Sequence, residues 1–253
     1  MPNQRPLIPE VRGVLTVHCI DGARRLGVDA FVTDRFGGVS EGPYESLNLG
    51  DHVGDDIAHV IENRRRVADA AGVEQLVIVR QVHGAEVLDA LNPGVKCEGD
   101  GLFSSSSDLA LAILVADCVP VLLVDEASHD FAVVHAGWRG LASGVLARAV
   151  ARFARPATLH AFLGPAISGE HYQVGPEVAT NFTDVPGAVL EDTRDRSLLD
   201  LRRVGAHQLR QLGLDDARVS VSDQGTDGGG LFFSDRAARP CGRFALVARR
   251  VVA

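Results

Sequence analysis

Several signatures of specialised protein classes are missing from this chain of 253 residues. It has four cysteines without the spacing of a disulfide framework, which fits a reducing compartment. The most apolar stretch, from Leu109 to Val124, is interrupted by Asp117 and is shorter than the roughly 20 residues that span a bilayer. Residues 1–13 contain charges and prolines and lack the apolar segment of a secretory signal. We therefore expect a cytoplasmic protein without membrane association.

A surplus of basic residues is also missing. The formal net charge is -8 at pH 7, and the sequence pI is about 5.6. Proteins that bind the phosphate backbone of nucleic acids usually carry a basic surface, so we expect no nucleic-acid partner. With 46% hydrophobic and 23% charged residues, the chain has the composition of a globular protein with a large core. The simplest organisation is one domain over residues 1–253, compatible with an internal duplication.

Local signatures of common metal sites are absent from the sequence. It contains no Cys-x-x-Cys, no His-Glu-x-x-His and no His-x-His, the signatures of zinc fingers, metalloproteases and multicopper oxidases. The His-x-Glu and Pro-Cys-x-x-Cys motifs of the cytidine deaminases are missing too. Any metal site must therefore be assembled from segments that are distant in the sequence.

The distribution of apolar residues predicts a mixed α/β chain. Short runs bounded by turn residues, many of them β-branched, are typical of buried strands. The middle third of the chain holds strand after strand, which disfavours a doubly wound parallel sheet and favours an α+β sandwich of mixed sheets. Predicted strands cover Val14–Ile20, Ala30–Thr33, Leu76–Val82, Leu109–Val115, Val119–Val124, Phe131–Val134, Leu159–Leu163, Ala217–Val221 and Phe244–Val252, and predicted helices cover Gly140–Phe153, Pro176–Phe182 and Leu198–Leu212.

A Gly-rich segment, residues 37–54, precedes the first predicted helix and is too long for a simple connector. Long loops of this kind often carry function. Asp55 or Asp56 is a suitable N-cap for a helix that ends near Ala71. In that helix we expect the apolar side chains on one face, namely Ile57, Val60, Ile61 and Val67.

Three separate segments, residues 81–84, 116–120 and 134–140, place a metal-competent side chain where an apolar run meets a Gly or Pro turn. Their side chains His83, Cys118 and His135 would supply two imidazoles and one thiolate. A catalytic zinc takes three protein ligands and keeps a fourth position open, whereas a structural zinc is closed by four. The alternative is that both histidines are hydrogen-bonded structural residues and that Cys118 is a small buried hydrophobe.

These segments resemble a known bacterial family. Together with residues 44–56 upstream and 163–168 downstream, they are similar to the family variously called polyphenol oxidase, laccase-domain protein or purine nucleoside phosphorylase-like zinc protein. The resemblance runs in order from about Thr33 to the C-terminus. It implies a four-layer sandwich, with helices outside two mixed β-sheets, and pseudo-repeated halves.

The resemblance also implies an activity. The family is similar to enzymes that act on adenosine, inosine, guanosine and methylthioadenosine by phosphorolysis and on adenosine by deamination. It implies that His83, Cys118 and His135 bind Zn²⁺ and that inorganic phosphate is a co-substrate. Zinc lowers the pKa of a bound water to about 7, which suits hydrolytic deamination. Asp117 is the nearest carboxylate for acid/base chemistry, with a hydrogen-bonded strand-end role as the alternative.

Phosphorolysis needs an oxyanion pocket, and the planar guanidinium of arginine is the usual phosphate partner. Arg139 lies four residues after His135, and further arginines fall in segments that match the family pattern. An arginine of this kind, taken alone, is more often a surface salt-bridge residue, but together they form a reasonable anion-binding set. We expect a catalytic role for Arg139, and substrate binding by Arg35, Asn48, Arg64, Gln81 and Arg236.

The C-terminal segment departs from the family pattern. The usual Phe-Phe-Ser-x-Arg-Arg-Asp reads Phe-Phe-Ser-Asp-Arg-Ala-Ala at residues 232–238, so Ala237 and Ala238 replace the second arginine and the aspartate. The usual Thr-Gly-Arg reads Cys-Gly-Arg at residues 241–243, and the usual Cys-Thr reads Gly-Thr at residues 225–226. These changes bear on substrate range and anion affinity, while all three metal ligands are intact.

Three other functions stay open. Cys118 with His83 or His135 would supply the nucleophile and base of a cysteine hydrolase, with an amide as one candidate substrate. The family resemblance implies a cell-wall precursor as the other. A site with two histidines and one cysteine would also bind Cu²⁺ in vitro, but nine histidines without a His-x-His pair make a polyphenol oxidase less favoured. A non-catalytic binding role would leave these residues unexplained. Bound zinc with a protected Cys118 favours the metal site, and a reactive thiolate without metal favours the hydrolase.

Overall fold

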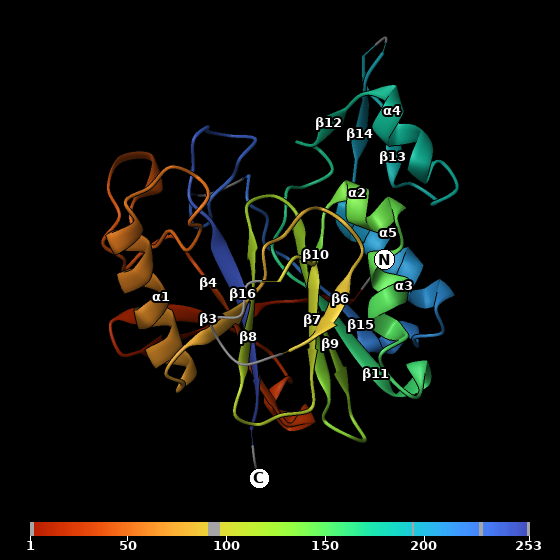
Figure 1. The fold of residues 1–253 in the computed structure, drawn as a ribbon. Coiled ribbons are helices and arrows are strands. Elements are labelled where there is room, and N and C mark those ends of the chain that lie inside the picture. Colours follow the sequence, from red (N-terminus) through yellow and green to blue (C-terminus); the bar gives the residue numbers. More distant parts are fainter. Residues whose placement is uncertain (1–2, 91–96, 194, 228–229, 252–253) are drawn as a thin grey trace.

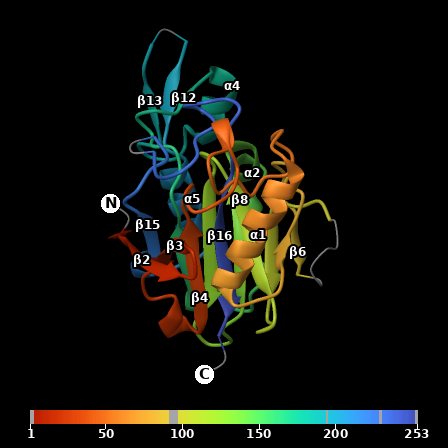
Figure 2. The same cartoon turned by 90° about the vertical axis from the view of Figure 1, so that its left-hand side faces the viewer.

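The computed structural model describes residues 3–90, 97–193, 195–227 and 230–251. Two large β-sheets lie face to face in the centre, and helices cover their outer faces (Figures 1 and 2). A third, small sheet extends from one end of the sandwich (Figure 1). The expected mixed α/β class, with mixed sheets flanked by helices, is confirmed.

The larger sheet is mixed. Its central strands pair antiparallel, whereas the strands at its two edges pair parallel with their neighbours. In the described residues its order is β1 (Asn3–Arg5), β15 (Val219–Ser222), β11 (Leu159–Leu163), β9 (Val119–Asp125), β10 (Phe131–Ala136), β7 (Gly101–Ser104) and β6 (Val87–Asp89).

The second large sheet is antiparallel except for one parallel edge pair. Over the described residues its order is β2 (Leu7–Arg12), β3 (Leu15–Ile20), β4 (Val28–Thr33), β16 (Phe244–Arg250), β8 (Ala110–Val115) and β5 (Leu76–Ile78). The small antiparallel sheet holds β12 (Gln173–Val174), β14 (Ser197–Leu199) and β13 (Val189–Glu191).

The helices are short apart from α1 and α5. They are α1 (Ile57–Ala71), α2 (Trp138–Ala142), α3 (Val145–Val150), α4 (Pro176–Ala179) and α5 (Leu201–Gln211), with 3-10 turns η1 (Arg24–Leu26), η2 (Gly42–Tyr44), η3 (Pro156–Thr158), η4 (Thr180–Phe182) and η5 (Asp216–Arg218). No helix within the described ranges is long and apolar enough to cross a membrane.

Three apolar clusters lie between the four layers and hold neighbouring layers together. One joins α1 to the six-stranded sheet, through side chains such as Val67 and Val247. The second fills the space between the two sheets, where Ile113 and Leu122 lie. The third joins the seven-stranded sheet to α2, α3 and α5 and includes Val204. Each cluster removes apolar side chains of neighbouring layers from water, which is the main force holding such layers together. The expected four-layer sandwich is therefore present.

The face that α1 buries differs from our prediction. Asp56 caps the helix as expected, because its side chain accepts a hydrogen bond from Ala58 N. However, Ile57 and Ile61 are 56% and 62% exposed, so the prediction that they share a buried face with Val60 and Val67 was wrong. The fully buried Asn63 lies on the buried face instead.

Asn63 explains this rotation of the helix. Its amide Nδ2 donates to Ser40 Oγ and to the backbone oxygens of Ser46 and Asn48, while its Oδ1 accepts from Val39 N. A buried polar side chain is tolerated where its hydrogen bonds are satisfied. The helix therefore turns this residue inward to hold the Gly-rich loop.

Two predicted helices were wrong in part. The segment predicted as one helix, Gly140–Phe153, begins earlier and is divided into α2 and α3, because Gly144 adopts a left-handed φ of 81°. The start of Leu198–Leu212 belongs to β14, and α5 begins only after the cap Asp200. The predicted strand Phe244–Val252 corresponds to β16, and Val252 lies outside the described residues.

Other elements lacked a clear apolar signal. Strands β1, β2, β6, β7, β12 and β13 were not predicted, and most of them are edge or short strands. The remaining predicted strands correspond to β3, β4, β5, β8, β9, β10, β11 and β15 with shifted ends. The single domain over residues 1–253 and the internal duplication stay predictions.

Candidate metal centre

The three predicted metal ligands come together at one end of the seven-stranded sheet. His83 lies in the loop between β5 and β6, Cys118 directly precedes β9, and His135 is near the end of β10. Strands β9 and β10 are antiparallel neighbours, with Pro120 opposite His135, so Cys118 lies beside the end of β10. One ligand atom of each residue lies within 4.8 Å of the others. Among the residues that the structure describes, this is the one group of three or more His, Cys, Asp or Glu side chains that could hold a metal ion.

Glycine makes room for the cluster. The imidazole rings of His83 and His135 are nearly perpendicular, with centroids 4.8 Å apart. A Cβ atom at Gly137 would lie 2.8 Å from Cys118 Sγ and 3.3 Å from His83 Cδ2. Such contacts are too short for a side chain, so any larger residue at position 137 would displace the ligands.

Two residues of the centre have a strained backbone. His83 has a φ of 58° and Asp117 a φ of 85°, in the left-handed region that non-glycine residues seldom adopt. Such strain persists only where surrounding contacts fix the conformation, and it is common at functional sites. Both segments have such contacts, supplied by two buried carboxylates.

The first carboxylate is Asp100, which is completely buried. Its Oδ1 accepts hydrogen bonds from His135 Nδ1 at 2.8 Å and from His83 N at 2.9 Å. Its Oδ2 accepts from Gly84 N at 2.6 Å and from Val82 N at 3.3 Å. An ionised carboxylate only accepts, so His135 keeps a proton on Nδ1, and Nε2 becomes available as a ligand once it has lost its own proton. Asp100 thus fixes both histidines.

The same contacts keep Asp100 ionised. Burial alone raises the pKa of this carboxyl group, but the hydrogen bonds from His135 and from Gly84 N outweigh burial and lower the pKa below its usual value. A carboxylate that stays charged at neutral pH is the partner that orients histidine ligands in many metal sites.

The Cys118 thiol and the buried His135 imidazole also shift each other's pKa. Burial raises the pKa of Cys118, but the charge of His135 and hydrogen bonds from His135 and His83 lower it to about 6. Burial lowers the pKa of His135, but the charge of Cys118 and the hydrogen bond with Asp100 raise it to about 9. The centre therefore favours a thiolate at neutral pH, which is the form that binds metals.

Asp117 is the second buried carboxylate. It accepts hydrogen bonds from Thr226 Oγ1 at 2.6 Å, from Ser234 Oγ at 2.7 Å and from Arg236 N at 2.7 Å. These partners belong to the C-terminal segments 223–227 and 230–243. Asp117 therefore joins these segments to the one that carries Cys118. Acid/base catalysis by Asp117 stays a prediction, and the observed contacts agree with the alternative role at the strand end.

Two arginines and a tyrosine lie around the cluster. The exposed Arg139 stacks on the ring of Trp138, with its Cζ 4.4 Å from the ring centroid. Arg236 lies over the ring of Tyr172 at 4.9 Å and donates to Gln173 O at 2.9 Å. Burial, followed by the charge of Cys118, raises the pKa of Tyr172 to about 12, against the opposing charges of Arg236 and Arg139. Cys118, Arg236 and Arg139 therefore all lie within electrostatic range of this phenol.

Gln81 and Asn48, predicted to bind substrate, are held by hydrogen bonds within the protein. Gln81 pairs with the backbone of Leu114 through both ends of its amide. Asn48 is fully buried, and its amide bonds to Gly50, Asp55 and Arg243.

Two of the predicted arginines contact the Gly-rich loop. Arg35 donates to Glu45 O and stacks on Phe233. Arg64 donates to Leu49 O and pairs with Asp51. Their contacts, like those of Asn48, support the Gly-rich loop, whereas Gln81 bonds to strand β8. Substrate binding by these four residues stays a prediction.

Sequence reasoning overlooked Asp100 and Tyr172. Asp100 lies between two glycines outside any apolar run, and nothing local links it to His135, which is 35 residues away. Tyr172 is one of two tyrosines in the chain and follows the segment 163–168 that carried part of the family resemblance. The scarcity of tyrosine was the one available signal.

A serine, a histidine and an aspartate also meet near Asp117, whose backbone oxygen accepts a hydrogen bond from Ile167 N. Ser168 Oγ contacts His171 Nδ1 at 2.9 Å and Asp227 Oδ2 at 2.7 Å, and the same His171 Nδ1 contacts Asp227 Oδ2. A catalytic triad places the serine and the aspartate on opposite ring nitrogens. Here both use Nδ1, so the arrangement is that of a hydrogen-bonded turn.

Known proteins share both sequence and fold with this chain. A purine nucleoside phosphorylase of Mycobacterium tuberculosis strain H37Rv is 40% identical over 226 residues, which cover 84% of this chain and 88% of that protein. The Escherichia coli K12 purine nucleoside phosphorylase YfiH is 37% identical over 229 residues, covering 87% of this chain and 92% of YfiH.

Solved structures agree. The crystal structure of YlmD from Geobacillus stearothermophilus has a TM-score of 0.87 at 30% identity and covers 98% of this chain and 100% of YlmD. That of a Neisseria meningitidis protein has a TM-score of 0.86 at 32% identity and covers 93% of this chain and 99% of that protein. The sequence profile described as multi-copper polyphenol oxidoreductase laccase matches residues 29–250. The chain therefore belongs to this laccase-like polyphenol oxidoreductase family, which includes relatives named purine nucleoside phosphorylases.

Proposed function

We propose that the protein is a zinc-dependent purine nucleoside phosphorylase that also deaminates adenosine. The observation that carries this proposal is the convergence of His83, Cys118 and His135. Arg139 lies four residues after His135, and Arg236 N donates to Asp117, the residue before Cys118. The names of the relatives support the phosphorylase part. Adenosine, inosine, guanosine and methylthioadenosine are the proposed substrates, inorganic phosphate is the proposed co-substrate, and the cytoplasm is the proposed location.

The residues of the centre fit a zinc ion. Two imidazoles and a thiolate are the donor types that zinc prefers, and three protein ligands are typical of catalytic sites. Copper would bind the same donors in vitro. The carboxylate of Asp100 fixes the tautomer of His135, and the exposed side of His83 leaves the centre open to solvent. A zinc ion bound here would supply Lewis-acid polarisation and activate water for deamination.

Phosphorolysis exchanges one bond at the ribose C1′ atom. The bond from C1′ to the purine N9 breaks, a phosphate oxygen forms the new bond to C1′, and the base leaves with the electron pair and gains, in net terms, the proton that the hydrogen phosphate loses. The products are the free purine and ribose 1-phosphate, or its 5-methylthio analogue when methylthioadenosine is the substrate. Arg139 and Arg236 would hold the phosphate dianion by charge-assisted hydrogen bonds. Tyr172 stays protonated at neutral pH, because its pKa is about 12, and would donate a hydrogen bond to the nucleoside.

Deamination, unlike phosphorolysis, does not require the arginines to bind phosphate. Adenosine and water give inosine and ammonia, and no added dianion takes part. Charge-assisted contacts to phosphate should therefore matter only for phosphorolysis. Arg139→Ala should slow release of the base from inosine about tenfold or more, with a smaller effect on ammonia release from adenosine. An equal loss of both activities would make Arg139 a structural residue.

Loss of metal ligands provides the main test. Cys118→Ala should lose both bound zinc and phosphate-dependent release of the base, whereas Cys97→Ala, Cys19→Ala and Cys241→Ala should keep both. Zinc is measured by elemental analysis, and the base by chromatography with and without phosphate. Zinc retained in Cys118→Ala would reassign the ligands. Fully bound zinc without turnover of any purine nucleoside would contradict the proposed activity.

A cysteine hydrolase is the second candidate, favoured by the lowered pKa of Cys118 beside His135. Alkylation with iodoacetamide at pH 7.5 separates the two functions. A metal site predicts that zinc protects Cys118 and that a chelator exposes it. Rapid alkylation that zinc does not slow, together with hydrolysis of an amide by the metal-free protein, would favour the hydrolase.

A further inference from the structure

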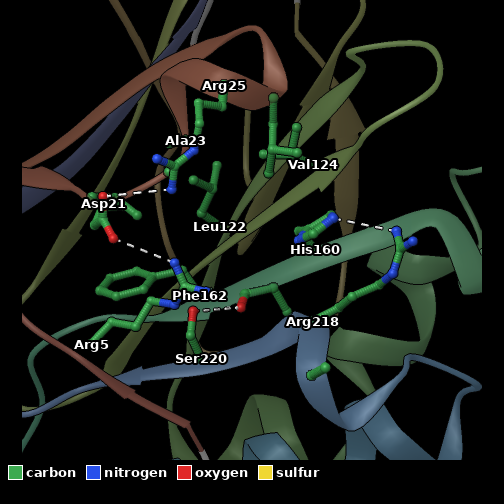
Figure 3. A pocket seen from close by; sticks show the side chains of 15 residues that line it. Arg5, Asp21, Ala23, Arg25, Leu122, Val124, His160, Phe162, Arg218 and Ser220 are labelled. Carbon is green, nitrogen blue, oxygen red and sulfur yellow. Dashed lines mark hydrogen bonds and ion pairs between the residues drawn. The ribbon is translucent and has the colours of Figure 1, made fainter.

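A cavity of about 150 Å³ lies away from the metal centre, where the chain after β3 meets β9, β11 and β15 (Figure 3). Leu122, which lines it, is four positions along β9 from Cys118. At about 3.3 Å per residue this separates the two by roughly 13 Å along the strand. The cavity therefore plays no part in binding the metal.

The floor of the cavity is apolar. It consists of the buried side chains Ile20, Leu122, Val124 and Phe162, which all belong to the core between the two sheets. Strand β3 ends at Ile20, and the chain turns away through residues 21–26, so the facing sheet does not cover this corner. An open apolar space of this volume accommodates a six-membered ring, since an engineered cavity of similar size in another protein binds benzene.

The rim carries an excess of positive charge, although the protein has a formal net charge of -8. Three arginines and one aspartate line the cavity, namely Arg5, Arg25, Arg218 and Asp21. Arg218 is already paired with Glu126 at 2.8 Å. Asp21 is shared by Arg5 at 3.4 Å and by Arg25 at 3.9 Å, so a single carboxylate faces two guanidinium groups at long distances (Figure 3).

These two guanidinium groups approach the same point of the backbone. A Cβ atom at Gly22 would lie 3.1 Å from Arg25 Nη2 and 3.5 Å from Arg5 Nη1. Two cations that share one carboxylate retain donors for a further anion, since each guanidinium has five N–H groups. The apolar floor lies next to them.

We infer that this cavity binds a small aromatic anion, with its ring on Leu122 and Phe162 and its carboxylate or phosphate group on Arg5 and Arg25. The apolar floor and the two arginines together select for a ligand that has both an aromatic ring and an anionic group. A neutral ring lacks the charge-assisted contacts, and a simple inorganic anion lacks the apolar contact. Asp21 competes with the ligand for the same two arginines, which makes its removal informative.

The test is a titration of the zinc-loaded protein with benzoate, phenyl phosphate and neutral benzyl alcohol. Binding is monitored through the NMR signals of the methyl groups of Ile20, Leu122 and Val124. Both anions should shift these signals, and the tighter one identifies carboxylate or phosphate as the preferred head group. Benzyl alcohol should bind at least about tenfold more weakly. An absence of shifts with both anions, or equal binding of benzyl alcohol, would overturn the inference.

Three variants locate the anion. Arg25→Ala should weaken benzoate binding about tenfold, while Arg155→Ala, an equal change of charge at an exposed residue that does not line the cavity, should leave it unchanged. Asp21→Asn should strengthen binding several-fold, because it removes the competing carboxylate. A gain of affinity cannot result from misfolding. Weaker binding in Asp21→Asn, or an equal loss in both arginine variants, would contradict the proposed site.

Discussion

Replacement of Asp100 by asparagine should weaken metal binding more than any other change outside the three ligands. Each carboxylate oxygen of Asp100 accepts two hydrogen bonds, one oxygen from His135 Nδ1 and His83 N, and the other from Gly84 N and Val82 N. Asparagine has nearly the same shape, but one oxygen becomes an NH₂ group. In either orientation of the amide, two N–H donors would face another donor.

The size of the effect follows from these contacts. A hydrogen bond to a charged group contributes about 1.5–3 kcal/mol, so the loss of two should lower the free energy of unfolding by about 3–6 kcal/mol. Loss of a carboxylate that orients a ligating histidine typically weakens metal binding by about 10–100-fold. His135 can then move its proton to Nε2, which removes a metal ligand.

Zinc affinity is measured by competition with a chromophoric chelator, and stability by urea unfolding of the metal-free protein. Asp125→Asn is the matched control. Asp125 is also a buried aspartate at the end of a strand of the seven-stranded sheet, but its side chain accepts a hydrogen bond from Ala127 N in a turn. The control should keep the zinc affinity of the wild type. An affinity within twofold of wild type in Asp100→Asn would refute the orienting role of Asp100.

Three further predictions follow from packing and charge. Gly137→Ala should weaken zinc binding about tenfold or more in the same competition assay, because the added Cβ would lie 2.8 Å from Cys118 Sγ, and an unchanged affinity would contradict this steric argument. Asn63→Leu removes four buried hydrogen bonds and should lower the free energy of unfolding in urea by about 2–4 kcal/mol, whereas a loss below about 0.5 kcal/mol would show that the loop does not depend on it. Burial raises the pKa of Asp29, but hydrogen bonds from Arg12 and Arg24 lower it overall, so its stabilising contribution is present above the unfolded value of 3.8 and is lost as the pH falls through the folded value. Asp29→Asn should therefore cost about 1–3 kcal/mol at pH 7 and progressively less as the pH falls below 3.8, and a cost that does not change with pH would contradict the ionic origin of the effect.

The convergence of the candidate ligands could be predicted from sequence in part, because two of their positions depend on local features. Cys118 and His135 flank one β-hairpin, and each lies where a continuous apolar strand meets a turn. Antiparallel pairing of these two strands is enough to bring their ends together. The approach of His83 needed the family resemblance, because its loop belongs to neither of these strands.

The supporting contacts could not be predicted in the same way. Asp100 acts through the loop 82–84 and through His135, and no periodic pattern relates these positions. Asn63 changed the buried face of α1 because its hydrogen bonds to the Gly-rich loop outweigh exposure of Ile57 and Ile61, whereas apolar periodicity counts only hydrophobic side chains. In both cases a buried polar side chain satisfies backbone groups that are distant in the sequence.

The most direct test of the proposed function is ³¹P NMR of inorganic phosphate incubated with inosine and the zinc-loaded protein. The three-ligand centre predicts that the phosphate signal is converted to that of ribose 1-phosphate, and that Cys118→Ala abolishes the conversion while Cys97→Ala does not. An unchanged phosphate spectrum with stoichiometric zinc bound, or conversion by Cys118→Ala at the rate of the wild type, would contradict the account.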